Sequence, residues 1–444
     1  MFVVVLVALA LIILISPGIV GRLAEENLKM SLRWVESEGE DVRVVEESFR
    51  RGWFTAEGRH RIELERGELR SAVLDFAGQA EGNRDNEHPA LIIDTRIDHG
   101  LVPLTSMARQ SGSLLPALAS THSTLQLDPG DGNIVDIPGN VYSRVGLFGE
   151  TASRYLAGPG TFDNDGQKAE WGAADIAVTA NPSSGRVQWQ GTVEGMSFVS
   201  GGDFAEVGSM RSSGDVAPGG FGFTVGSIEL DIESLMLRQG QSPDNGAKAR
   251  FEDLVLDARS EVDGDRVNAN STLKVAGIAV PGFGDAEINV DVAVSGLDGS
   301  SLRTIITALQ DAAGRNGANV ALYPQVNTDL QRLLAFGGEL RINRLDFALP
   351  QGDLTTRMLV TLPETAADGR FSVPAMLLAL TASADLRIPV ALIEVVQAGN
   401  PQFGALVAMG FLKRDGDAYV LQAEYEKGLL TVNGAPMPIP LRGR

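Results

Sequence analysis

Four histidines are the side chains that most readily carry acid–base or metal chemistry, because an imidazole titrates near neutral pH. They are His60, His88, His99 and His122. Zinc hydrolases often hold the metal through two histidines one helical turn apart with a glutamate between them, and no pair here has that spacing. His99 stands between Asp98 and Gly100, which favours a hydrogen-bonded turn; the alternative is a site assembled through space from His99 and distant acids. We therefore assign no catalytic residue, no metal ligand and no cofactor-binding residue.

Other sequence motifs that are associated with catalysis or ligand binding are absent or incomplete. The chain has no cysteine, which excludes thiol nucleophiles and thiolate metal sites, and it has no Gly-x-Ser-x-Gly elbow. Gly220-Phe221-Gly222 has the glycines of a phosphate loop, but the alternating stretch 228–232 stands where a helix should follow. Asp163, Asp165 and Gly166 match part of a calcium-binding loop that lacks its terminal acid. Both segments are predicted to be turns.

The first twenty residues, from Met1 to Val20, determine where the rest of the molecule lies relative to a membrane. They contain no ionisable side chain, and fourteen of them are Val, Leu, Ile or Phe. Twenty helical residues span about 30 Å, the thickness of the hydrocarbon core of a bilayer. At roughly −0.4 kcal/mol per central apolar residue, insertion is favoured by about 5–6 kcal/mol. The sequence therefore predicts one transmembrane helix at residues 1–20, carrying a large body on one side.

This segment is either a retained anchor or a cleaved secretory signal. A signal has a basic n-region and a small-x-small cleavage site, and neither is well formed here, which favours the anchor. Arg22, Lys29 and Arg33 follow the segment; the positive-inside rule, taken alone, would place the body in the cytoplasm.

The overall composition describes a folded acidic body. Hydrophobic residues make up 44%, which suffices for a sizeable core, and the formal charge is −20. This charge argues against nucleic acid as a partner and against broad adhesion to anionic lipid headgroups. The absence of cysteine fits either side of the membrane.

Alternating apolar and polar residues dominate the body, as at 228–233, 288–295 and 419–425. This period is typical of antiparallel strands with one face in water. Helical spacing occurs at 301–313, 327–336 and 390–398, and loops are predicted at 158–166, 212–220, 239–246 and 314–317. The fold class is α+β and mostly β: a transmembrane helix, then extended antiparallel sheets of hairpins with a few packed helices. Domain boundaries are predicted at 1–20, 21–160, 161–315 and 316–444, with 21–444 as one continuous region as the alternative.

Several segments, in order, resemble the YdgA-like family of Gram-negative envelope proteins, whose function is unknown. They are the apolar N-terminal span, Phe49-Arg50-Arg51-Gly52-Trp53-Phe54, His99-Gly100-Leu101-Val102-Pro103, the segments 333–340 and 349–352, and Gly428-Leu429-Leu430-Thr431-Val432-Asn433-Gly434. The resemblance covers nearly the whole chain, although Pro103 is displaced from the family's pattern.

This resemblance implies an anchor in the bacterial inner membrane with the body in the periplasm, which overrides the charge-based orientation. It also suggests a distant architectural likeness to AsmA-like proteins, which have long sheets with a groove for lipid. The family supplies no catalytic residues. Trp53 and Phe54 are predicted to pack on a strand, with an interfacial or lipid contact as the alternative.

The apolar strand faces leave two functions open. A covered face is core, whereas an open face forms a groove for acyl chains or hydrophobic peptide. We expect a non-enzymatic envelope protein that binds lipid or another hydrophobic ligand; the alternatives are a protein-interaction scaffold, as a homodimer or with envelope proteins, and, third, a hydrolase.

The C-terminal hairpin is predicted in detail. Strands at 418–425 and 429–432 are joined by a turn at Glu426-Lys427-Gly428, and a second turn follows at Asn433-Gly434. Tyr419, Leu421 and Tyr425 should share one face. Pro436, Pro438 and Pro440 lack the N–H donor, so the sheet should end near Asn433 and leave an extended tail at 435–444.

The anchor and its orientation can be tested directly. A reporter fused after Arg444 should be active in the periplasm alone, and the mature protein should keep Met1–Val20. Cytoplasmic activity would overturn the orientation, and a mature N-terminus near residue 20 would overturn the anchor.

Overall fold

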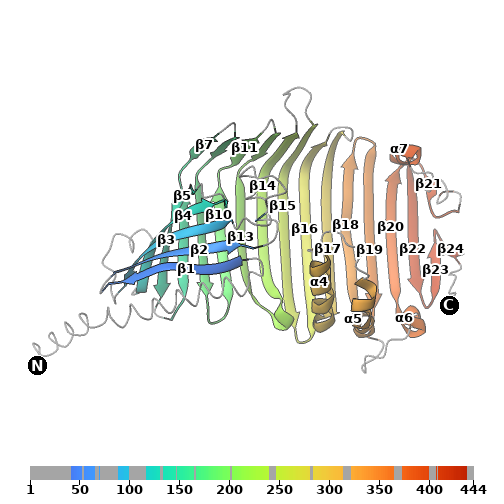
Figure 1. The fold of residues 1–444 in the computed structure, drawn as a ribbon. Coiled ribbons are helices and arrows are strands. Elements are labelled where there is room, and N and C mark those ends of the chain that lie inside the picture. Colours follow the sequence, from blue (N-terminus) through green and yellow to red (C-terminus); the bar gives the residue numbers. More distant parts are fainter. Residues whose placement is uncertain are drawn as a thin grey trace, which may run out of the picture. The chain divides into compact units, whose positions relative to one another are not determined.

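A computed structural model provides the fold, and it divides the chain into two compact units (Figure 1). Unit 1 comprises Met1–Thr161 and Glu170–Glu194; unit 2 comprises Phe162–Ala169 and Gly195–Arg444. The structure describes residues 42–52, 55–65, 70, 89–99, 117–130, 134–146, 148–164, 167–200, 203–239, 247–280, 284–313, 322–364, 373–399, 407 and 409–437.

Unit 1 is built on an antiparallel sheet in which each strand pairs with the next in the order β1-β2-β3-β4-β5-β6-β9-β10. Its strands are β1 (Val42–Arg51), β2 (Thr55–Leu64), β3 (Ala90–His99), β4 (Ala117–Asp128), β5 (Val135–Gly146), β6 (Thr151–Ala157), β9 (Ala174–Asn181) and β10 (Arg186–Val193). The short strands β7 (Gly160–Asn164) and β8 (Gln167–Trp171) come between β6 and β9 in the sequence.

Unit 2 carries the longest strands, in the order β14-β15-β16-β17-β18-β19-β20-β22, all antiparallel. These strands are β14 (Thr224–Gln239), β15 (Ala247–Asp263), β16 (Arg266–Val280), β17 (Gly284–Asp298), β18 (Gly338–Leu349), β19 (Gly352–Leu362), β20 (Thr381–Pro389) and β22 (Ala418–Glu426). Shorter strands flank this series at both ends. They are β11 (Met196–Ser200), β12 (Asp203–Val207) and β13 (Met210–Pro218) beside β14, and β21 (Lys413–Asp415), β23 (Leu429–Val432) and β24 (Ala435–Met437) beside β22.

The helices of unit 2 are α4 (Gly299–Ala313), α5 (Leu322–Phe336), α6 (Val373–Ala379) and α7 (Val390–Gly399), with the short 3₁₀ turn η2 (Gly220–Gly222). In Figure 1, α4 and α5 are drawn in front of the lower part of the sheet around β16–β19, whereas α6 is at the lower edge and α7 at the upper edge. The three predicted helices are confirmed by α4, α5 and α7, whereas α6 was not predicted. Among the described residues no helix has the length and apolarity needed to cross a membrane, and residues 1–20 lie outside them.

The mostly-β prediction is confirmed, and two predicted loops are wrong. The segments 158–166 and 212–220 contain β7 and most of β13. Serines and glycines predicted a loop in the second segment, but the backbone of β13 forms a full ladder with β14, from Met210 opposite Ile232 to Pro218 opposite Thr224. Long-range pairing therefore outweighs the local turn propensity of these residues.

At the C-terminus both predicted turns are confirmed. Lys427, Gly428, Asn433 and Gly434 all have positive φ, from 50° to 78°. The predicted tail is wrong at residues 435–437, because β24 pairs with β23 and places Pro436 opposite Thr431; residues 438–444 lie outside the described residues. A proline fits there because β24 is at the edge of the sheet, where a missing N–H donor is tolerated.

Asp298, the last residue of β17, caps the first turn of α4. Its Oδ2 accepts hydrogen bonds from the Ser301 backbone N–H at 3.0 Å, the Ser301 hydroxyl at 2.6 Å and the Ser300 hydroxyl at 2.9 Å. Arg332 of α5 lies 3.4 Å from the same oxygen, so one carboxylate ties both helices to β17. Burial raises the pKa of Asp298, but the hydrogen bonds from Ser301 and Ser300 and the charge of Arg332 together bring this pKa below its usual value.

Replacing this cap gives a test of the fold. Asp298→Ala should lower the free energy of unfolding by about 1–2 kcal/mol at pH 7. Because the pKa is lower in the folded than in the unfolded state, the stabilisation is complete above the unfolded value of about 3.9 and is lost as the pH falls through the folded value. Denaturant titrations of wild type and variant should differ at pH 7 and converge in strong acid. The exposed Asp231, replaced by alanine, serves as the control and should change stability by less than about 0.5 kcal/mol.

Candidate functional site

The register of unit 2 aligns apolar side chains in rows that run across the strands. Residues directly opposite one another in an antiparallel sheet point to the same face. Row 1 is Ile232, Leu254, Val275, Ile288, Phe347 and Leu354. Row 2 is Leu230, Leu256, Leu273, Val290, Leu345, Thr356, Leu386 and Leu421.

Two further rows continue the same surface toward the ends of the strands that adjoin α4 and α5. Row 3 is Ile228, Ala258, Ser271, Val292, Ile342, Met358, Ala384 and Ala423. Row 4 is Gly226, Ser260, Ala269, Val294, Leu340, Val360, Ala382 and Tyr425. The four rows contain no charged side chain, and together we call them the apolar face.

The opposite face of the same strands is polar. One transverse line of it is Asp231, Val255, Lys274, Asn289, Asp346, Thr355 and Arg387. Ion pairs between neighbouring strands recur on it, such as Arg357 with Asp346 at 3.8 Å. Solvent therefore meets this face, and the apolar side chains are gathered on the other.

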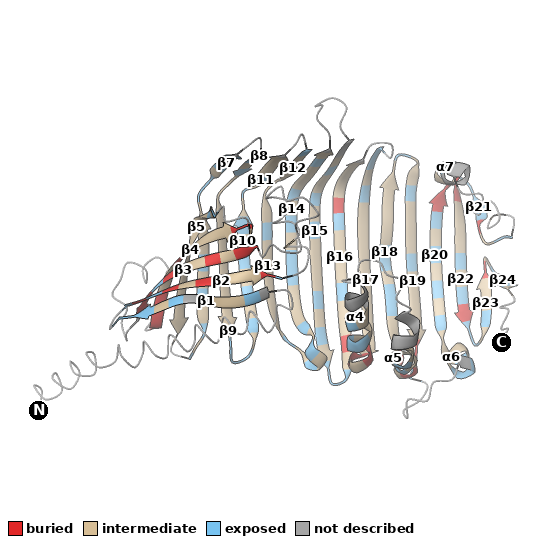
Figure 2. Cartoon of the chain, viewed as in Figure 1, coloured by how far each residue is buried: buried red, intermediate tan, exposed pale blue. Residues whose placement is uncertain are grey.

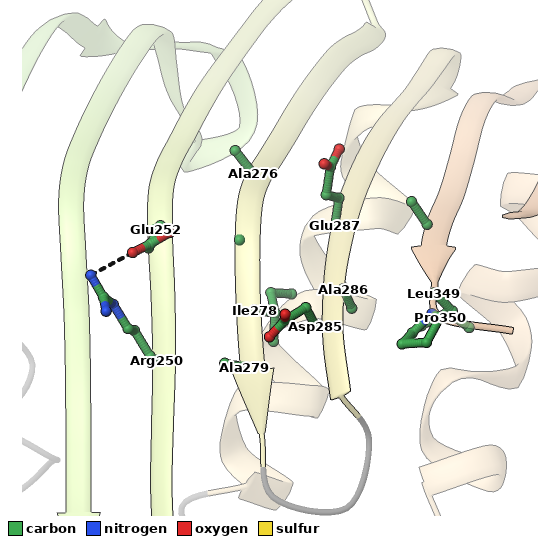
Figure 3. A pocket seen from close by; sticks show the side chains of 12 residues that line it. Arg250, Glu252, Ala276, Ile278, Ala279, Asp285, Ala286, Glu287, Leu349 and Pro350 are labelled. Atoms are coloured by element: carbon green, nitrogen blue, oxygen red, sulfur yellow. Dashed lines mark ion pairs between the residues drawn. The ribbon is translucent and has the colours of Figure 1, made fainter. Parts of the chain in front are cut away.

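Beyond row 1 the ladder is irregular in β15 and between β16 and β17. Asp253 has a φ of 49°, and the register between β16 and β17 shifts between Val275 and Ile278. Arg250 and Glu252 then join Asp285 and Glu287 around a cavity of about 580 Å³, shown in Figure 3. The intervening Phe251 is paired with Ile278 instead.

Helices cover the apolar face at its β20–β22 end. Ile393 of α7 and Leu412 form a buried cluster with Ile388, and Leu354, Leu386, Tyr419 and Leu421 pack against it. At the other end of β22, the Tyr425 hydroxyl donates a hydrogen bond of 2.8 Å to the Leu377 carbonyl of α6. The predicted shared face of Tyr419, Leu421 and Tyr425 is therefore confirmed, and helices pack on it.

Over β14 to β19 the described residues form no comparable buried cluster on the apolar face. Within the four rows, Val275 and Tyr425 are buried, while the other side chains are half-buried or exposed (Figure 2). Ile228 and Leu340 retain 39% and 36% of their accessible surface. We call the part of the apolar face on β14–β19 the open section.

Unit 1 differs, because its buried residues gather on β2, β3 and β4 (Figure 2). Ala56, Ile97 and Ala119 form a buried cluster there, and the buried hydroxyls of Thr95 and Ser123 lie 2.8 Å apart. Both observations indicate a packed core in this part of unit 1.

A cavity of about 380 Å³ on β1–β4 is lined by arginines and acids together with His122. Arg59 lies 3.4 Å from Asp94, and Glu57 is opposite both Arg50 and Arg96 in the sheet. The cations thus alternate with carboxylates, which is the arrangement of a surface charge lattice rather than of an anion site.

The histidines do not assemble into a site within the described residues. His60 is buried in β2, and the His122 Nε2 lies 2.7 Å from Asn140 Oδ1 while its ring stacks on Tyr142. His99 ends β3 opposite Ala119; its side chain and all of His88 lie outside the described residues. In the described part of the chain, no group of three or more acidic or histidine side chains could hold a metal ion.

The remaining motifs are structural where they are described. Phe221 of η2 has a φ of 60° and packs beside Gly299 at the start of α4, so this segment is a turn, as predicted. Asp163 pairs with Lys168 at 3.0 Å, and Asp165 and Gly166 lie outside the described residues. Trp53 and Phe54 also lie outside them; the flanking described residues share a 2.7 Å hydrogen bond from Gly52 N–H to Thr55 O.

An extended antiparallel sheet with one charge-free apolar face, and with a few helices, defines the chain as a β-rich protein without a recognisable reaction centre in its described residues. Residues 1–440 match the family described as bacterial protein of unknown function (DUF945), and the chain belongs to that family. Comparisons with curated proteins and with solved structures gave no match.

Two leucines of row 2 test the difference between the covered and open sections. Leu421→Asp places a carboxylate against the cluster of Ile388, Ile393 and Leu412, and should lower the free energy of unfolding by several kcal/mol. Leu256→Asp, in the same row but on β15, should cost about 1 kcal/mol because water reaches the new carboxylate. Circular dichroism melting measures both, and equal losses would show that the open section is as well covered as the section under α7.

Proposed function

We propose that this protein is a non-enzymatic component of the bacterial envelope that binds the acyl chains of lipid on its apolar face. The observation that carries the proposal is the continuity of rows 1 to 4 across unit 2 without a charged side chain. A hydrocarbon chain that binds to such a surface gains dispersion contacts and releases water from both apolar surfaces. The surface offers few directed hydrogen bonds, which a hydrocarbon cannot make.

The size of the open section supports a binding role. Six strands about 4.8 Å apart, and four rows about 6.8 Å apart, cover roughly 24 by 20 Å, or about 500 Å². The largest apolar patches of soluble monomers have a comparable extent, about 300–600 Å², and such patches are often functional. Leaving the open section in water opposes stability, so a bound hydrocarbon would stabilise unit 2.

The proposed location is the inner membrane, with residues 1–20 as the anchor and the body in the periplasm. The apolar N-terminal segment and the resemblance to YdgA-like proteins support this location. The long antiparallel sheet of unit 2 is also consistent with the suggested architectural likeness to AsmA-like proteins, although fold likeness alone does not define function.

The alternative is a scaffold in which a second copy or another envelope protein covers the open section. An area of about 500 Å² per partner is below the roughly 800 Å² of a standard interface, which favours lipid. A defined protein complex without lipid would support this alternative.

The experiment is lipid analysis of the full chain extracted in mild detergent, by native mass spectrometry. Wild type should carry phospholipid. Val290→Asp, which places a charge in row 2, should lose most of it, whereas the matched control Asn289→Asp, one residue away on the polar face, should keep it. Circular dichroism checks that both variants remain folded. Wild-type protein free of lipid, or equal retention by the two variants, would contradict the proposal.

A further inference from the structure

The side-chain rows of the apolar face define grooves that run across the strands. In a regular antiparallel sheet, neighbouring side chains of one row are about 4.8 Å apart, whereas successive rows are separated by two residues, or about 6.8 Å. The depressions on this surface therefore lie between rows, perpendicular to the strands. One groove lies between rows 1 and 2, and the next lies between rows 2 and 3.

The chemistry of these two grooves suits hydrocarbon. On the open section, row 1 and row 2 present Ile, Leu, Val and Phe, with one hydroxyl at Thr356. Row 3 adds one hydroxyl, Ser271, beside the small Ala258. Because the rows hold no charge, a charged or zwitterionic headgroup must lie beyond them, at the margin of the face.

Each groove is long enough to hold one acyl chain. The open section is about 24 Å wide across its six strands. A bilayer core of about 30 Å holds two chains end to end, so each chain spans about 15 Å, or roughly four strands. Beyond β19 the cluster of Ile388, Ile393 and Leu412 under α7 closes the surface.

We infer that the two acyl chains of a diacyl lipid lie across strands β14–β19, one in each groove, with row 2 between them. This inference rests on the proposed function and adds the ligand class and its orientation. The leucines of row 2, Leu230, Leu256 and Leu273, then contact both chains, whereas residues of row 1 and row 3 contact one chain each.

Photo-crosslinking of the detergent-purified full chain tests the orientation. The probes are two phosphatidylcholines, one with a diazirine in the middle of an acyl chain and one with a diazirine near its methyl end. Mass spectrometry should find the two probes on different strands, with the labels of both confined to rows 1 to 3. Labels that follow one strand through all four rows would overturn the inference while leaving lipid binding intact; no labelling above that of the polar face would overturn the proposed function as well.

A matched pair of variants tests the two-chain arrangement. Ser271→Trp fills the groove between rows 2 and 3 and leaves the other groove free; Thr272→Trp places the same ring on the polar face. Ser271→Trp should weaken binding of the diacyl lipid about tenfold or more and leave the single-chain lysophosphatidylcholine within about threefold. The control should change neither, and equal losses for both lipids with Ser271→Trp would overturn the arrangement.

Discussion

The antiparallel register of β14 to β22 is the constraint on which the rest of unit 2 depends. A shift of one residue in any pairing would turn every side chain of that strand to the other face. In the observed register, Leu230 meets Leu256, Leu256 meets Leu273 and Leu273 meets Val290, so each strand extends the same apolar surface. Cross-strand contacts of this kind contribute about 0.2–1 kcal/mol each, and they accumulate along the sheet.

Local irregularities preserve this arrangement at points where an extra residue would otherwise turn the following side chains to the opposite face. Asn343 adds a residue to β18, so that Leu345 and Ile342 still face Val290 and Val292. At the end of β17, Gly296 has a φ of 70°, and Leu297 remains opposite Val267. Bulges commonly re-aim side chains in this way, and here they maintain one apolar face over strands of up to seventeen residues.

The sequence predicted the local features well, because they depend on residues close together in the chain. Alternation located β14, β17 and β22, helical spacing located α4, α5 and α7, and Glu426-Lys427-Gly428 predicted a turn. Strand order and register depend on contacts between residues that are distant in the sequence. Alternation alone therefore could not predict that rows 1 to 4 are continuous, or that helices pack on the apolar face at β20–β22. β13 and β24 were missed for the same reason, since their serines, glycine and proline are turn formers that pairing overrides.

The edge strand β24 has a consequence for how molecules of this protein can associate. A sheet this long would offer its last strand as a template on which a neighbouring chain could add, and repeated addition produces fibres. Here the outermost strand is three residues long and contains Pro436, which lacks the N–H that a new partner strand would need. The short, proline-containing β24 therefore disfavours the addition of another chain to this strand.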